Sequence, residues 1–125
     1  MVKKDDKPQD LSYGKKPPLS LVPPSAIIYA SKALENGSKK RSPYNWRESK
    51  ISIMQTLDKT LRHLYKYLDG QDIDEESGLP ELSHAIADLS VLIDAVATNS
   101  VVDDRPKFGV ARIVMDSFKE ENNNE

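Results

Sequence analysis

Acidic side chains gather in one stretch of this chain, and basic side chains gather just upstream of it. The segment 69–88, DGQDIDEESGLPELSHAIAD, holds seven carboxylates, one imidazole and no lysine or arginine. The segment 37–50, GSKKRSPYNWRESK, holds five basic residues and one acid. Concentrated carboxylates attract divalent cations, and clustered cations attract phosphates. A fold that brings the two segments together would suit a nucleotide polyphosphate bound with a metal ion.

The metal ligands that we predict come from two expected helices. Glu81, His84 and Asp88 follow one another at i, i+3 and i+7, which places them within roughly a 60° arc of a helix. Carboxylates suit Mg²⁺ or Mn²⁺, and an imidazole tolerates Mn²⁺ or Co²⁺. Asp58, on the preceding helix, completes the predicted set. The alternative is an ordinary solvated face, with Asp58 paired to Arg62 at i, i+4.

The substrate contacts and proton transfers are predicted from the remaining charged and aromatic side chains. Lysine and arginine neutralise phosphate oxygens, and a tryptophan either stacks on a base or anchors a loop to the core. A histidine on a helix flank either takes a proton or bonds to a neighbour. The predicted phosphate and base contacts are Lys39, Lys40, Asn45, Trp46, Arg47 and Arg62, and the predicted catalytic residues are His63, Glu76 and Asp88.

Helical periodicity dominates the chain. We expect helices at about 24–37, 51–68, 80–98 and 107–120, with apolar side chains at 3.6-residue spacing. No sustained alternation of apolar and polar residues predicts a strand. The fold class is therefore all-α, a bundle of about four helices. Residues 1–20 form an expected flexible arm, 21–120 the domain, and 121–125 a disordered tail.

The composition limits the possible functions. The chain has 125 residues, a net charge of -2 and no cysteine, so we expect one domain without disulfides or thiolate metal sites. Nothing indicates a nucleic acid polymer or a membrane as partner, and we expect a soluble cytoplasmic protein. Short amphipathic helices would expose apolar surface in a lone chain, which predicts a homo-oligomer, either dimer or tetramer. A monomeric bundle is the alternative.

Three blocks carry a resemblance to a known family. They are KPPLSLVPPSAI at 16–27, NGSKKRSPYNWRESKI at 36–51, and a longer block at 57–95. The longer block begins with LDKTLRHLYKYLDG and contains DIDEESGLPELSHA. The chain resembles the MazG-like, or MazZ-type, phage dATP/dGTP diphosphohydrolases. The resemblance implies an all-α pyrophosphohydrolase that cleaves a deoxynucleoside triphosphate between its α and β phosphates with Mg²⁺, Mn²⁺ or Co²⁺. In phages that use 2-aminoadenine, such an enzyme supplies dGMP in the host cytoplasm.

The chain departs from the motifs of the wider superfamily. Where that superfamily carries EExxE on one helix, this chain offers Asp58 and His63. Where it carries ExxD, this chain keeps Asp88 but has Ala85 in place of the glutamate, next to His84. Our mechanistic hypothesis is that a metal-bound water attacks the α-phosphorus and that a carboxylate or His63 accepts its proton. A rival hypothesis is a non-catalytic helical module that binds a phage or host protein.

Overall fold

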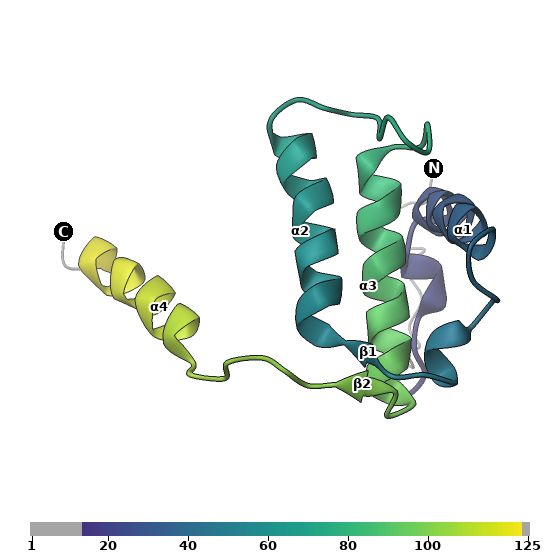
Figure 1. Cartoon of the computed structure of the whole chain (residues 1–125). Coiled ribbons are helices and arrows are strands. Elements are labelled where there is room, and N and C mark those ends of the chain that lie inside the picture. The colour runs from purple at the N-terminus through teal and green to yellow at the C-terminus, as the bar shows by residue number, and fades with distance from the viewer. Residues whose placement is uncertain (1–13, 124–125) are drawn as a thin grey trace, which may run out of the picture.

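The computed structural model describes residues 14–123, with side chains described as far as Lys119. The fold is all-α, as expected, and helices α2 and α3 lie side by side with α1 across the far side of α3 (Figure 1). The expected arm and tail lie partly outside the described residues, at 1–13 and 124–125. The elements in order are η3 Leu19–Leu21, α1 Pro24–Ser38, η4 Asn45–Arg47, β1 Ile51–Ser52, α2 Ile53–Leu68, α3 Glu81–Ala97, β2 Val101–Val102 and α4 Val110–Asn123.

Small side chains lie at the contacts between α1, α2 and α3. The buried positions on these helices are mainly alanine, serine and threonine, which let backbones come close and leave little volume to fill. Ala95, near the end of α3, has a relative exposure of 0%. The small buried residues are Ala30 and Ala33 on α1, Thr56 and Thr60 on α2, and Ser83, Ala85, Ala87 and Ala95 on α3.

The larger apolar side chains of α2 and α3 lie mostly on the surface. We expected the leucine stripes of these helices to pack as the core, but Leu68 is 78% exposed and Ile93 is 71% exposed. Leu61, Leu64 and Leu89 are also exposed, at about two-fifths of their area. Three helices of one chain are too few to cover both stripes. The exposed surface is the kind that a helix–helix interface buries.

A short parallel ladder, which the sequence did not predict, joins the start of α2 to the end of α3. Ile51 pairs with Val101 and Ser52 with Val102. Two residues per strand are too few to show alternation, so no sequence signal marks the ladder. The chain following β2 then reaches the first turn of α2. There Asp104 accepts hydrogen bonds from the backbone N of Met54 at 2.9 Å and from Oγ of Ser52 at 2.5 Å.

Helix α4 extends away from the other helices on the segment 103–109 (Figure 1). It begins at Val110 rather than at the predicted 107, because Lys107 and Gly109 have φ angles of 60° and 69° that interrupt a right-handed helix. Its apolar side chains are exposed, with Phe118 at 62%. Within the described residues, no helix combines the length and the apolar character needed to cross a membrane.

The hydroxyl of Ser52 should stabilise the start of α2. It accepts a hydrogen bond of 3.1 Å from the backbone N of Gln55 and donates one to Asp104. The variant Ser52→Ala should lower the free energy of unfolding by about 1 kcal/mol, measured by urea denaturation. Ser49→Ala is the matched control, because the Ser49 hydroxyl reaches only a carbonyl at 3.5 Å. Equal stabilities of the two variants would contradict the capping role.

Candidate active site

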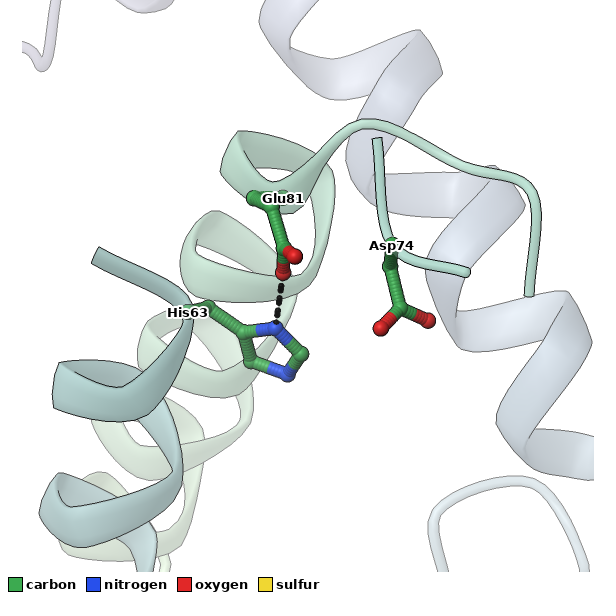
Figure 2. Close-up of side chains that lie close together, drawn as sticks. All are labelled: His63, Asp74 and Glu81. Carbon is green, nitrogen blue, oxygen red and sulfur yellow. Dashed lines mark hydrogen bonds and ion pairs between the residues drawn. The ribbon is translucent and has the colours of Figure 1, made fainter. Parts of the chain in front are cut away.

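A fully buried carboxylate marks the point where α2, α3 and the loop between them meet. Glu81, the first residue of α3, has a relative exposure of 0%. Its Oε1 lies 2.6 Å from Nδ1 of His63 on α2, and its Oε2 accepts a hydrogen bond of 2.6 Å from Nε2 of Gln71. Both oxygens are engaged, as a buried carboxylate requires. Figure 2 shows this pair, with the second ring nitrogen of His63 directed away from Glu81.

The acidic loop 69–80 presents a second buried carboxylate beside this pair (Figure 2). Oδ2 of Asp74 accepts a hydrogen bond of 3.0 Å from the backbone N of Ser77. Gly78, with a φ angle of 74°, lets the loop turn back so that the Asp74 backbone N donates to the Leu79 carbonyl at 2.8 Å. Burial opposes ionisation of Asp74, but the hydrogen bonds from Ser77 and the nearby imidazoles outweigh it and lower its pKa.

Two imidazoles stack at the centre of the site. The rings of His63 and His84 lie 4.8 Å apart between centroids, with 15° between their planes. Nε2 of His84 lies 2.6 Å from Oγ of Ser77 and 3.6 Å from Oδ2 of Asp74. Each ring therefore has one nitrogen engaged by a neighbour, which fixes its orientation.

The donor groups of this site fit a divalent ion. His63, Asp74 and Glu81 each offer a ligand atom, and these atoms lie within 4.8 Å of one another. Two carboxylates and an imidazole are ligands that Mg²⁺ or Mn²⁺ accepts. Asp88, two turns along α3 from Glu81, has a buried Oδ2 without a hydrogen-bond partner among the described residues. A buried carboxylate oxygen in that state can accept a hydrogen bond from water or bind a cation.

The environment of Asp88 opposes its charge. Burial raises the pKa of its carboxyl, and the nearby cations only partly compensate. The first of these cations is Lys59, whose Nζ lies 3.8 Å from Oδ1 of Asp88. A carboxylate that is costly to ionise is also one that gains most when a cation binds to it.

A cleft of about 1120 Å³ joins this site to the basic segment. Its walls come from the end of α1, the loop after α1, α2, the acidic loop and α3. Cations and carboxylates line it together, so the convergence expected from the two charged segments exists in the fold. The basic lining residues are Lys40, Arg41, Lys50, Lys59, Arg62 and Lys66, and the acidic ones are Glu35, Asp74, Glu76, Asp88 and Asp94.

The predicted site residues divide into those that the fold brings to the cleft and those that it does not. Lys39 and Asp58 are exposed and do not line it, and Arg47 points instead to Asp94. Glu81 lies buried behind His63. The predicted residues that line the cleft are Lys40, Asn45, Trp46, Arg62, His63, Glu76, His84 and Asp88.

One carboxylate of α3 holds the loop that follows α1. Oδ2 of Asp94 accepts hydrogen bonds from Nε1 of Trp46 at 2.7 Å and from Nε of Arg47 at 2.9 Å. Oδ1 of Asp94 accepts a third, of 2.8 Å, from the Arg47 guanidinium. These bonds, from Arg47 first and Trp46 second, lower the pKa of Asp94 to about 2. The indole N–H of Trp46 and two guanidinium nitrogens of Arg47 are thus bonded to Asp94.

Three residues of the site lie outside the set predicted from the sequence. Asp74 belongs to the acidic loop that we singled out, but its burial depends on the turn at Gly78. Gln71 is a neutral side chain, and only the structure shows it bonded to Glu81. Asp94 lies 48 residues from its partner Trp46, so no local spacing links the two.

The helices and the cleft together define a small all-α domain with donor groups for both a polyanion and a cation. The sequence profile of the family described as "dATP/dGTP diphosphohydrolase, N-terminal" matches residues 6–105, and the chain belongs to this family. A protein of Salmonella phage PMBT28 named dATP/dGTP diphosphohydrolase is 31% identical over 90 residues. That match covers 72% of this chain and 30% of the phage protein, so the chain spans under a third of its relative. No solved structure matches significantly.

Replacing the buried Asp88 carboxylate with an amide should stabilise the protein at neutral pH. Because the folded-state pKa of Asp88 is raised, the folded protein binds more protons than the unfolded chain between the two pKa values. The free energy of unfolding should therefore fall as pH rises through that interval, and stay reduced above it. Asp88→Asn should remove this fall.

Urea denaturation at several pH values, without divalent ions, measures the effect. Asp116→Asn, which changes an exposed carboxylate on α4, is the control and should keep the wild-type pH dependence. If Asp88→Asn is no more stable than wild type at pH 7, ionisation of the buried Asp88 carboxyl does not destabilise the fold.

Proposed function

We propose that this domain hydrolyses dGTP or dATP between the α and β phosphates, releasing the monophosphate and pyrophosphate. The observation that carries the proposal is the cleft, whose lining brings six basic side chains together with His63, Asp74 and Asp88. Membership of the diphosphohydrolase family and the printed name of the phage relative support the reaction. Phosphate anhydride hydrolysis depends on positioning and charge neutralisation, and both groups of residues serve those needs.

The basic side chains that line the cleft account for phosphate binding in this proposal. Lys40 and Arg62 line the cleft and were predicted for this role, and Lys59 joins them beside Asp88. Guanidinium and ammonium groups neutralise phosphate oxygens, the former in a bidentate manner. Lys39 stays a prediction, because its exposed side chain lies outside the cleft lining.

In this proposal, His63 accepts the proton of the attacking water. Its Nδ1 faces the carboxylate of Glu81, an acceptor, so Nδ1 carries the hydrogen and Nε2 is left with a free lone pair. A carboxylate in this position orients the imidazole and stabilises it once it is protonated. Glu76, at the mouth of the cleft near Lys40, is a second predicted participant.

Asp74, Glu81 and Asp88, with the imidazole of His84, would hold one or more divalent ions, Mg²⁺, Mn²⁺ or Co²⁺. An ion bound there would supply positive charge to the triphosphate oxygens. The unpartnered Oδ2 of Asp88 supports this assignment. Asp58 was predicted as a ligand and stays a prediction, since its exposed side chain does not line the cleft.

Within a phage-infected cell, this reaction would supply dGMP in the host cytoplasm to a pathway that makes 2-aminoadenine nucleotides. We also infer that the domain acts as a homo-oligomer, a dimer or a tetramer. The exposed leucine and isoleucine side chains of α2 and α3 support that inference. The same exposed faces would serve the rival hypothesis, a non-catalytic module that binds a phage or host protein.

Incubation with dGTP or dATP tests the reaction. With Mg²⁺, Mn²⁺ or Co²⁺ we expect the monophosphate and pyrophosphate, and chelation should stop turnover. Asp88→Asn should lower kcat by about 100-fold or more while the helical circular dichroism stays unchanged. Asp116→Asn on α4 is the control and should retain activity. Orthophosphate as product would point to another hydrolase, and no turnover with any nucleotide would favour the binding module.

The oligomer prediction is tested by light scattering after gel filtration. We expect two or four times the chain mass of 14.0 kDa. Ile93→Glu should shift the protein toward the monomer, because a charge on that exposed apolar face opposes burial in an interface. Leu19→Glu, at an 80% exposed position before α1, should leave the assembly unchanged. A wild-type mass of one chain at all concentrations would refute the prediction.

A further inference from the structure

We propose that the ring of Tyr44 is the surface on which the purine base of the nucleotide stacks, and that Asp94 is the positioning residue that holds this ring at the cleft. The inference rests on the proposed function, since it requires a nucleotide in the cleft. It adds Tyr44 to the predicted candidates for base contact, Trp46 and Asn45, which stay predictions.

The anchoring begins at Asp94, near the end of α3. Its two oxygens accept three hydrogen bonds, of 2.7–2.9 Å, from Trp46 and Arg47. The Trp46 indole has a single N–H, and Asp94 already accepts it. The Arg47 guanidinium is held in the bidentate geometry that pairs most strongly with a carboxylate. These bonds hold both side chains in place beside α3.

The anchored pair in turn fixes Tyr44. The Arg47 guanidinium lies over the Tyr44 ring at 4.7 Å from its centroid, and the Trp46 ring lies 5.2 Å away at 38°. Tyr44 itself has a φ angle of 58°, a left-handed conformation that is uncommon for an aromatic residue. Such a conformation persists where surrounding contacts impose it, and it often occurs at binding sites. Tyr44 as a whole remains 57% exposed, and it lines the cleft.

The cleft offers different groups for the two parts of a nucleotide. Asp88, at the proposed ion site, precedes Asp94 by six residues on α3, which is about 9 Å along the helix axis. Lys59 and Arg62, two of the cleft-lining cations that suit phosphates, belong to α2, whereas Tyr44 belongs to the loop after α1. Its exposed ring offers a flat apolar surface, and stacking on such a ring tolerates any base. A ligand with phosphates at one end and a planar base at the other can contact both the cations and the Tyr44 ring.

The test compares a ligand that has a base with one that lacks it. Stopped-flow quenching of Trp46, the only tryptophan in the chain, reports binding of dGTP and of inorganic tripolyphosphate before turnover. Tyr44→Ala should weaken dGTP binding about tenfold and leave tripolyphosphate binding unchanged. Tyr44→Phe, which keeps the ring, should restore dGTP affinity. Tyr65→Ala, which removes an exposed ring of α2 outside the cleft, is the matched control.

The positioning role of Asp94 is tested in the same assay. Asp94→Asn removes the charged partner of Arg47 but keeps an acceptor for Trp46, so the fold should survive. We expect dGTP affinity to fall severalfold, tripolyphosphate affinity to hold, and the Trp46 emission spectrum to shift. A merely structural role would weaken both ligands equally, and that result would overturn the assignment.

Failure of this inference differs from failure of the proposed function. Hydrolysis of dGTP with unchanged dGTP affinity in Tyr44→Ala would overturn the stacking role and leave the reaction intact. Tight dGTP binding that depends on Tyr44 without any hydrolysis would support the stacking role and refute the reaction. Absence of dGTP binding to the wild-type protein would overturn both.

Discussion

The arrangement of this domain depends on a carboxylate that cannot reach water. Glu81 is buried at the start of α3, and an unpaired charge there would be strongly destabilising. Its two partners, His63 of α2 and Gln71 of the connecting loop, belong to different elements. Satisfying one buried group therefore fixes the spacing of two helices and the path of the loop between them. The same bonds orient the imidazole that we assign as the proton acceptor, so stability and chemistry share one set of contacts.

A second carboxylate plays the corresponding part at the other end of α3. Asp94 ties the loop after α1 to this helix through Trp46 and Arg47. Without that tie, a loop rich in cations and poor in apolar side chains would have little reason to stay near the acidic residues. Helix α3 thus holds both α2, through Glu81, and the loop after α1, through Asp94. Asp88 lies on α3 between Glu81 and Asp94, and burial makes its ionised form unfavourable. A bound cation would offset that cost.

The sequence predicted the helices within a few residues, because amphipathic spacing, prolines and glycines are local signals. It also predicted the meeting of the acidic and basic segments, and eight of the residues predicted for the site line the cleft. It did not predict which apolar faces are covered, since the single chain packs through alanines and threonines and exposes its leucines. Nor could it find Asp94, whose partners are far away in sequence. Local patterns give elements and charges, whereas pairings between distant elements depend on the assembled fold.

The hydrogen bonds between Asp104 and the start of α2 determine how far the chain can be shortened from its C-terminal side without loss of contacts in the packed helices. The chain beyond β2 is not a loose extension, since removing Asp104 would leave the Met54 amide and the Ser52 hydroxyl without their partner. The family match ends one residue later, at 105. A protease acting at 106–109 would therefore detach α4 while sparing every contact of the cleft. The smallest fragment that keeps the contacts of the cleft should therefore end just past Asp104.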